Sequence, residues 1–469
     1  MKNILKALAL FLVIVQLQSC FVGKKYQRPE GIASTDLFRK EYQKEDTANI
    51  AFMEWRNFFT DEQLQQHISY ALDSNFDFNA ALENIKIARA TYLQSNSAFL
   101  PGVNASLGGT YVSPSLNTQT GRLLDERTHQ FQYDITGSLS WEADIWGKLS
   151  SAKRAAFASL QGTIAARQAL QTTIISNLAS MYYQLLILDE QKKITAQTIE
   201  FRKKSLETTQ SLKEAGTVTE VAVQQSKAQL INTQALLVSI DNQITVLENS
   251  FNLLLGKNPG AVTRSELSQQ RIPATLSIGV PYQLLSNRPD VRAAEYNFMN
   301  AFELTNVAKS MFYPSLTINA STGLQSVDFD KLFSAKSWFA NAVGSLTQPI
   351  WNKRQLKTQH EIRQANQEIA YLNYRKAVLT AGREVSDALA NYDTQSQLET
   401  LKAQEQEAYH KATEYSQELL IHGWPNTSYL EVLTAQQNEL NAELASYNAT
   451  YGKLNAVVQL YKALGGGWK

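Results

Sequence analysis

Residues 223–254 have the sequence VQQSKAQLINTQALLVSIDNQITVLENSFNLL, in which mostly apolar side chains recur at steps of three and four. This heptad spacing is typical of a helix packed along another helix. Residues 430–461 repeat the pattern in the same phase, so the chain is a tandem duplication. The paired positions are Val223 and Leu430, Ser226 and Leu433, Leu230 and Gln437, Thr233 and Leu440, Leu237 and Leu444, Ile240 and Tyr447, Ile244 and Tyr451, Leu247 and Leu454, Phe251 and Val458, and Leu254 and Tyr461.

The duplication extends upstream of these helices. A weaker heptad seam over residues 174–188 matches residues 381–395, in register with the first pair. Before the helices, Asp144-Ile145-Trp146-Gly147-Lys148 echoes Pro349-Ile350-Trp351-Asn352-Lys353. A period of this length is far beyond that of a small solenoid repeat, so we expect two structural halves of one domain.

Composition argues against several classes of function. The 469 residues carry 44 Lys and Arg against 43 Asp and Glu, and this balance gives no reason to expect a nucleic-acid partner. Five His are too few for a histidine-rich metal site. The chain also lacks His-Glu-x-x-His, Gly-x-Ser-x-Gly, Gly-Lys-Ser/Thr and Cys-x-x-Cys motifs. We therefore expect no enzyme, no cofactor and no metal.

The amino terminus predicts an exported chain. Lys2 and Lys6 precede an apolar run over residues 7–15, which is too short to span a bilayer as a helix but suits a cleaved signal peptide. Leu17-Gln18-Ser19-Cys20 closes the run, and Cys20 is the only cysteine. This tetrapeptide resembles the lipobox of bacterial lipoproteins, in which the cysteine becomes the lipidated first residue of the mature chain.

The expected organisation follows the two repeats. It comprises a signal peptide over 1–19, a lipidated segment and first helix over 20–74, a first repeat over 75–260, a linker over 261–287 and a second repeat over 288–469. We expect residues 22–49 to be extended over the folded body. Asp61 is a plausible helix N-cap, and a second helix is expected from about Asp77 until Pro101 ends it.

The period changes from helical to two after Pro101. Alternation over residues 131–141 places aromatic and aliphatic side chains on one face and polar ones on the other, and residues 103–111 alternate in the same way. Residues 315–325 and, more weakly, 340–347 are the corresponding strands of the second half. Eleven alternating residues with aromatic ends match a strand of an outer-membrane barrel. A half-buried strand of a soluble sandwich has the same period, so the pattern alone leaves that alternative open.

Four strands per chain are too few for a closed barrel. An open sheet in lipid leaves edge donors and acceptors unsatisfied, so the bilayer demands closure by other copies of the chain. The smallest outer-membrane barrels have about eight strands, so two copies would suffice and three would give a water-filled pore.

Long helices follow each pair of strands. Residues 151–215 lack proline, and at about 1.5 Å per residue a helix of this length reaches about 100 Å. Gly216-Thr217-Val218-Thr219 breaks this helix, and the second copy turns over residues 422–428. Each half is therefore expected to run strand, strand, long helix, tight turn, long helix.

The chain resembles the TolC-like outer-membrane efflux proteins, specifically the lipoprotein branch that serves resistance-nodulation-division pumps. Three stretches carry the resemblance in addition to Cys20: Trp55 with Phe59-Thr60-Asp61, residues 281–295 (PYQLLSNRPDVRAAE) and residues 429–436 (YLEVLTAQ). The Arg-Pro-Asp-Val-Arg run is the most specific of them. Read from its residues alone, it favours helix initiation, because Pro289 suits a first turn and Asp290 complements the helix dipole.

The resemblance implies a mostly α-helical protein whose four strands join those of two other copies. The homotrimer would form an outer-membrane β-barrel that continues as an α-helical coiled-coil barrel across the periplasm. It would be a passive conduit for small molecules, lipid-anchored to the outer membrane and docked on a periplasmic adaptor that is bound to an inner-membrane pump. The implied adaptor-facing tips comprise Gly216, Thr217, Thr219, Gly423, Thr427 and Ser428, and Glu431 is implied at the periplasmic aperture.

The sequence departs from the family pattern near the second turn. Thr434 stands where an Asp is common, Leu420 where a Tyr often precedes the glycine, and the turn is about two residues longer. The rival hypothesis is a membrane-anchored coiled-coil structural or adhesive lipoprotein, which explains Cys20 and the heptads but not the alternating strands. The transported substrate is not indicated by the sequence.

Overall fold

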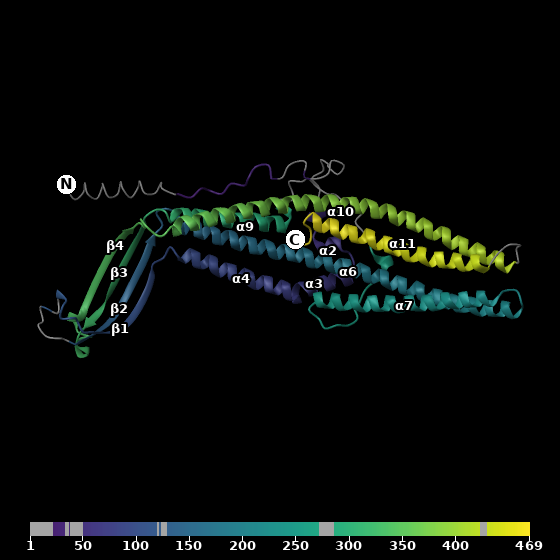
Figure 1. Cartoon of the computed structure of the whole chain (residues 1–469), viewed down its shortest axis with the longest axis horizontal. Coiled ribbons are helices and arrows are strands. Elements are labelled where there is room, and N and C mark those ends of the chain that lie inside the picture. Colours follow the sequence, from purple (N-terminus) through teal and green to yellow (C-terminus); the bar gives the residue numbers. More distant parts are fainter. Residues whose placement is uncertain are drawn as a thin grey trace. The chain divides into compact units, whose positions relative to one another are not determined.

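The computed structural model describes residues 22–32, 37, 50–119, 122, 129–271, 286–422 and 429–469 (Figure 1). Long helices follow each pair of strands, as the sequence predicts. The elements are η3 (Ile50–Phe52), α2 (Trp55–Phe58), α3 (Glu62–Ser74), α4 (Phe76–Ser97), β1 (Gly102–Val112), β2 (Gln130–Ala143), α6 (Lys148–Glu214), α7 (Glu220–Leu254), η4 (Leu267–Gln269), α9 (Pro289–Ser310), β3 (Ser315–Ser326), η5 (Phe329–Lys331), η6 (Ala335–Ser337), β4 (Trp338–Thr347), α10 (Gln355–Ile421) and α11 (Tyr429–Ala463).

The described residues form two compact units, and each unit draws on both sequence repeats. The first contains residues 22–29, 85–162 and 294–373, which include the whole sheet. The second contains the described parts of 30–84, 163–293 and 374–469, which include most of the long helical hairpins. The contacts therefore divide the chain across the repeats rather than between them.

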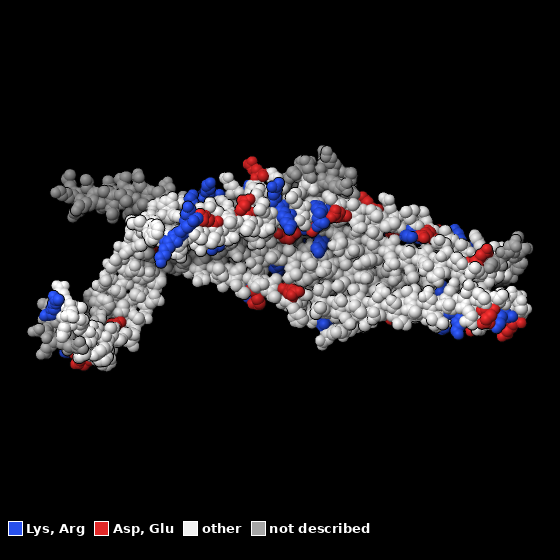
Figure 2. Space-filling model, viewed as in Figure 1, with Lys and Arg blue, Asp and Glu red and all other residues white. Residues whose placement is uncertain are grey.

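The sheet of the first unit has four antiparallel strands in the order β1-β2-β3-β4. All four strands were predicted from alternation, although β4 begins at Trp338, two residues before its expected start. A glycine is required where β3 pairs with β2 opposite Thr136, because a Cβ on Gly323 would lie 2.0 Å from the backbone oxygen of Ile135. The strands contain only two charged residues, Asp134 and Glu142, and Figure 2 shows the sheet surface largely white.

The segment after the amino terminus lies along α9 in the first unit. The Lys24 amide donates to Asn306 Oδ1 at 3.2 Å, and Asn306 Nδ2 donates to the Lys24 carbonyl at 2.9 Å. Arg28 forms an ion pair with Glu295 at 2.7 Å, and Tyr26 makes edge-on ring contacts with Phe298 and Phe302. Residues 24–29 contain no helix, strand or turn, so the expected extended path is confirmed over that part, and a turn follows at residues 30–31.

In the second unit, α6 pairs with α7 and α10 pairs with α11 (Figure 1). Lys192 and Asp241 form an ion pair at 2.7 Å across the first pair, and Lys453 and Glu399 form one at 2.6 Å across the second. Seam residues of both copies are buried. They include Val223, Ile240 and Phe251 of α7 and Leu433, Leu440 and Leu454 of α11.

Two predicted helix starts are confirmed in this unit. Asp61 Oδ1 accepts from the Leu64 amide at 3.0 Å at the start of α3, and Asp61 Oδ2 accepts from the Tyr182 hydroxyl. α9 begins at Pro289 with Asp290 in its first turn. Burial opposes ionisation of Asp290, but its hydrogen bonds and ion pair with the Arg288 guanidinium lower the carboxyl pKa.

Candidate functional site: a two-faced sheet and the ends of the helical hairpins

One face of the sheet is apolar and exposed. On β1 the odd-numbered residues form this face, and the apolar residues Val103, Leu107 and Tyr111 among them are 72%, 80% and 53% exposed. The strand register continues this apolar face onto β2 and β3, because Leu107 lies opposite Ile135 and Ile135 lies opposite Leu324. An extended apolar face of this kind marks a surface that water does not cover in the functional state.

The opposite face is polar. It carries Gln132, Asp134, Thr136 and Ser138 of β2, next to the even-numbered Asn104, Ser106 and Thr110 of β1. A polar face behind an apolar face is the arrangement of a barrel wall, with lipid outside and water inside.

Aromatic side chains gather at both ends of the sheet. At one end the rings of Tyr111 and Phe131 lie 5.0 Å apart, and those of Tyr133 and Phe329 lie 5.3 Å apart. At the other end the Trp146 and Tyr313 rings lie 5.0 Å apart. The rings of transmembrane barrels gather in two interfacial belts of this kind.

The strand-to-helix junction is held by carboxylates. Asp144 accepts from the Leu149 and Ser150 amides at 2.8 Å, so it satisfies free donors at the start of α6. Glu142, at the end of β2, forms an ion pair with Lys148 at 2.8 Å. The Asp-Ile-Trp-Gly-Lys motif of the first copy is therefore a structural junction rather than a ligand site.

The predicted tip residues of the first hairpin form a tight exposed turn. Gly216 has φ +74°, a conformation that glycine adopts without the steric cost of a side chain. The Thr217 amide and hydroxyl both donate to the Leu212 carbonyl, at 2.9 and 2.7 Å. Thr219 occupies the N-cap position of α7, without a side-chain cap. Gly423, Thr427 and Ser428 lie outside the described residues.

An ion pair closes this turn. Lys213 Nζ lies 2.5 Å from Glu220 Oε2, and both side chains face solvent. Hydrogen bonding to Glu220 raises the pKa of Lys213, and hydrogen bonding to Lys213 lowers that of Glu220. A basic last turn followed by an acidic first turn is the sequence signal for such a pair, which was not among the predicted site residues.

Glu431 is exposed in the first turn of α11. Two residues earlier, the Tyr429 hydroxyl accepts from Thr209 Oγ1 at 2.5 Å and lies 3.1 Å from Ser205 Oγ. The start of α11 is thus attached to the last turns of α6, close to the first hairpin's tip. Nothing in the local sequence revealed that Tyr429 makes this contact, because its partners lie more than 200 positions away.

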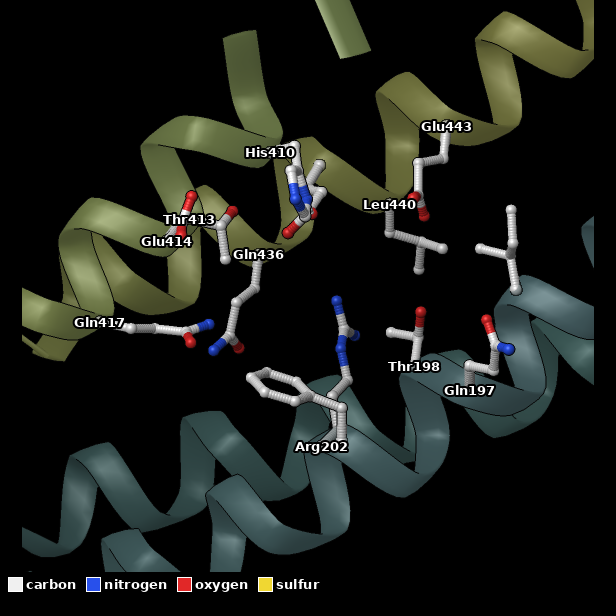
Figure 3. A pocket seen from close by; sticks show the side chains of 13 residues that line it. Gln197, Thr198, Arg202, His410, Thr413, Glu414, Gln417, Gln436, Leu440 and Glu443 are labelled. Carbon is white, nitrogen blue, oxygen red and sulfur yellow. Dashed lines mark hydrogen bonds and ion pairs between the residues drawn. The ribbon is translucent and has the colours of Figure 1, made fainter. Parts of the chain in front are cut away.

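A cavity of about 400 Å³ lies between α6, α10 and α11 (Figure 3). The buried Arg202 side chain extends into this space from α6. Its guanidinium donates to the Gln229 carbonyl at 2.8 Å, to Thr233 Oγ1 at 2.5 Å and to Gln437 Oε1 at 3.1 Å. Arg202 therefore links both helical hairpins, and burial lowers its pKa.

The far wall of the cavity is acidic. His410 Nδ1 lies 2.6 Å from Glu439 Oε1, and the hydrogen bond and charge of Glu439 raise the pKa of His410. Burial, and then the charge of Glu439, raise the pKa of Glu443. Among the described residues no group of three or more His, Cys, Asp or Glu is placed to hold a metal ion. The cavity is a polar packing gap between hairpins, with no assembled catalytic set.

Comparisons with known proteins agree with this geometry. A family model described as "Outer membrane efflux protein" matches residues 67–257 and 280–466. The chain is 30% identical to the toluene efflux pump outer membrane protein TtgF of Pseudomonas putida, over 97% of this chain and 95% of that protein. It is 26% identical to the cation efflux system protein CusC of Escherichia coli, over 98% of each chain.

A solved structure supports the fold. The outer-membrane channel OprN superposes with a TM-score of 0.88 at 24% identity, covering 96% of this chain and all of that one. In the part of the chain that the structure describes, no helix has the length and apolarity needed to cross a bilayer.

The chain belongs to the outer membrane efflux protein family. It is therefore an outer-membrane channel component of an efflux system and not an enzyme. The rival hypothesis of an anchored structural or adhesive lipoprotein is set aside, because the family match spans both repeats and includes the strands.

Proposed function

We propose that three copies of the chain close into a twelve-stranded barrel that conducts small molecules passively through the outer membrane. The observation that carries this proposal is the four-stranded sheet with one apolar face, one polar face and two free edges. Among the described strands, β1 and β4 each pair on one side only.

The bilayer makes closure necessary. β1 has eleven residues and β4 has ten, and about half of their backbone groups point away from the sheet. Each such group left unsatisfied in hydrocarbon costs several kcal/mol, so an open edge is not stable there. Three copies give a pore wide enough for water, whereas two give a barrel filled by its own side chains.

A lipid anchor at Cys20 fits the path of the mature chain's first residues. Lys24 is bonded to Asn306, which lies nine positions before β3 begins. Only three residues separate Cys20 from Lys24, so lipidation of Cys20 would anchor the chain close to its membrane strands. Several acyl chains at this position add membrane affinity at roughly 0.8 kcal/mol per buried methylene.

The turns of the helical hairpins are the proposed adaptor-facing tips. Gly216, Thr217 and Thr219 are exposed and present small side chains around a tight turn. Gly423, Thr427 and Ser428 are assigned to the same role by the duplication. The adaptor would connect the tips to an inner-membrane resistance-nodulation-division pump, which supplies the energy.

Glu431 is proposed to line the periplasmic aperture. It is exposed in the first turn of the helix that Tyr429 attaches to α6. Carboxylates at a narrow opening favour cations and repel anions by their field.

The proposed cargo is small molecules, and we assign the selection among them to the inner-membrane pump. The names of the two relatives refer to toluene and to cations, which share no chemistry. A pore face of Ser, Thr, Asn and Gln side chains discriminates little between such cargoes.

Native mass in mild detergent, measured on protein from separated outer membranes, tests the proposal. A trimer is expected, and deletion of the gene should cause pump substrates to accumulate in cells. A Cys20→Ser chain should still require detergent for extraction, because the barrel holds it in the membrane. A monomer, or release of Cys20→Ser without detergent, would refute closure between copies.

A further inference from the structure

The two β-hairpins, one formed by β1 and β2 and the other by β3 and β4, are equivalent copies with the same internal register. Gly102 and Ser140 pair at the start of the first hairpin, and Ser315 and Thr347 pair at the start of the second. The first strand of each hairpin begins directly after a proline, Pro101 or Pro314, that ends one of two similar stretches, Ser-Ala-Phe-Leu-Pro and Ser-Met-Phe-Tyr-Pro. Ser315 therefore takes the place of Gly102, and Thr347 takes the place of Ser140.

Side-chain hydrogen bonds confirm this equivalence independently. Trp141 Nε1 donates to the Phe99 carbonyl at 2.9 Å, and Gln348 Nε2 donates to the Phe312 carbonyl at 3.1 Å. Each donor follows the last paired residue of its hairpin, and each acceptor lies three positions before the first strand. The hairpins thus match at both ends of the strands.

The join between the two hairpins is the ladder between β2 and β3, in which Ser140 lies opposite Asn319. From this repeated geometry we infer that β4 of one copy pairs antiparallel with β1 of the next copy, with Thr347 opposite Ser106. Ser106 is the counterpart of Asn319, because each lies four residues after the start of its strand. This inference rests on the proposed trimer and specifies its contact residue by residue.

The inferred register keeps both faces continuous around the barrel. It brings Leu346 opposite Leu107 on the apolar face, and these side chains are 67% and 80% exposed in the single chain. It also brings Val343 opposite Thr110 on the polar face. A slip of one residue would place apolar side chains against polar ones, so such slips are excluded by the two-residue period.

A slip of two residues preserves the faces, and the structure offers one such alternative. Trp146 Nε1 donates to the Pro314 carbonyl at 2.6 Å across the hairpin join, and its sequence counterpart Trp351 is 87% exposed. Trp351 follows Thr347 by four residues, whereas Trp146 follows its matching residue by six. Trp351 could make the equivalent hydrogen bond to the Pro101 carbonyl of the next copy. If that contact determined the register between copies, Thr347 would lie opposite Asn104.

Disulfide trapping separates these registers. The variants are Thr347→Cys with Ser106→Cys and Thr347→Cys with Asn104→Cys, each oxidised with copper phenanthroline in isolated outer membranes. Within one chain β1 and β4 are three strand spacings apart, about 14 Å, so any bond between them joins two copies. The matched control is Ser140→Cys with Asn319→Cys, which occupies the same ladder position inside one chain. The three single-cysteine variants, Thr347→Cys, Ser106→Cys and Asn104→Cys, are run beside them.

The Ser106 pair is expected to form covalent dimers and trimers about as fast as the control pair loses its thiols. The Asn104 pair should oxidise at least about tenfold more slowly, because a two-residue offset moves the Cα atoms beyond the reach of a disulfide, roughly 7 Å. Faster trapping of the Asn104 pair would overturn the register. In that case native mass and export, measured before oxidation, would still report a trimeric conduit. If neither pair links copies while the control oxidises, the β4 to β1 contact itself is wrong.

Discussion

Gly323→Ala should destabilise the sheet strongly, whereas Gly344→Ala on the neighbouring strand should not. A Cβ on Gly323 would lie 2.0 Å from the Ile135 carbonyl oxygen and 3.0 Å from Thr136 Cα, and both are backbone atoms that cannot rotate away. A Cβ on Gly344 meets nothing within 4 Å inside the chain, and the inferred register places Gly344 opposite Gly109 of the next copy, which has no side chain. The two substitutions add the same methyl group to the same sheet, so their difference isolates the close approach of β2 and β3.

The magnitude follows from the distance that the strands must move. Bringing the contact to about 3.0 Å separates β2 from β3 locally by about 1 Å, which stretches about two ladder hydrogen bonds past the bonding range. Their loss costs about 1 kcal/mol each, and overpacking adds about 1–3 kcal/mol. The expected loss is roughly 3–5 kcal/mol for Gly323→Ala. For Gly344→Ala a change of about 0.5–1 kcal/mol in the stabilising direction is expected, because alanine restricts the unfolded chain.

Urea unfolding of the detergent-solubilised protein, followed by tryptophan fluorescence, measures both variants, since Trp141 and Trp338 lie on the sheet. The midpoint should fall for Gly323→Ala only, with an unchanged slope. Equal midpoints for the two variants would show that the strands have room at Gly323, and the reasoning from the close approach would be wrong.

Three further predictions concern the helical part. Gly216→Asp should abolish export while the trimer keeps its native mass, because the turn is proposed to face the adaptor; normal export by this variant would remove the tip assignment. His410→Gln should lower the unfolding midpoint at pH 5.5 but not at pH 9. Glu439 raises the pKa of His410 in the folded protein, so protonated His410 stabilises the fold. This contribution is complete below the ordinary pKa of histidine and disappears as pH rises through the folded-state pKa. A loss that grows with pH would contradict the pairing. Arg264→Gln should lower the free energy of unfolding by about 2–3 kcal/mol, because it leaves partly buried Glu248 and Asp189 without their guanidinium partner, and thermal unfolding of the variant measures this loss.

Polar contacts between distant segments could not be predicted from the sequence. Arg202 looks like one more cation on a helix, yet it is buried and bonded to two other helices. Tyr429 likewise joins a helix that starts more than 200 residues earlier in the chain. A local pattern reports which face a residue occupies but does not report which side chain faces it from another helix.

The sequence by itself determined the tandem duplication, the four alternating strands, the long helical hairpins and the turn of the first hairpin at Gly216. Each of these depends on local periodicity or backbone conformation, which neighbouring residues set. Only the tertiary structure decided the strand order and register, the attachment of residues 24–28 to α9, and the links between hairpins made by Arg202 and Tyr429. Those features require long loops to close and donors to meet distant acceptors, so they are decided by packing in three dimensions.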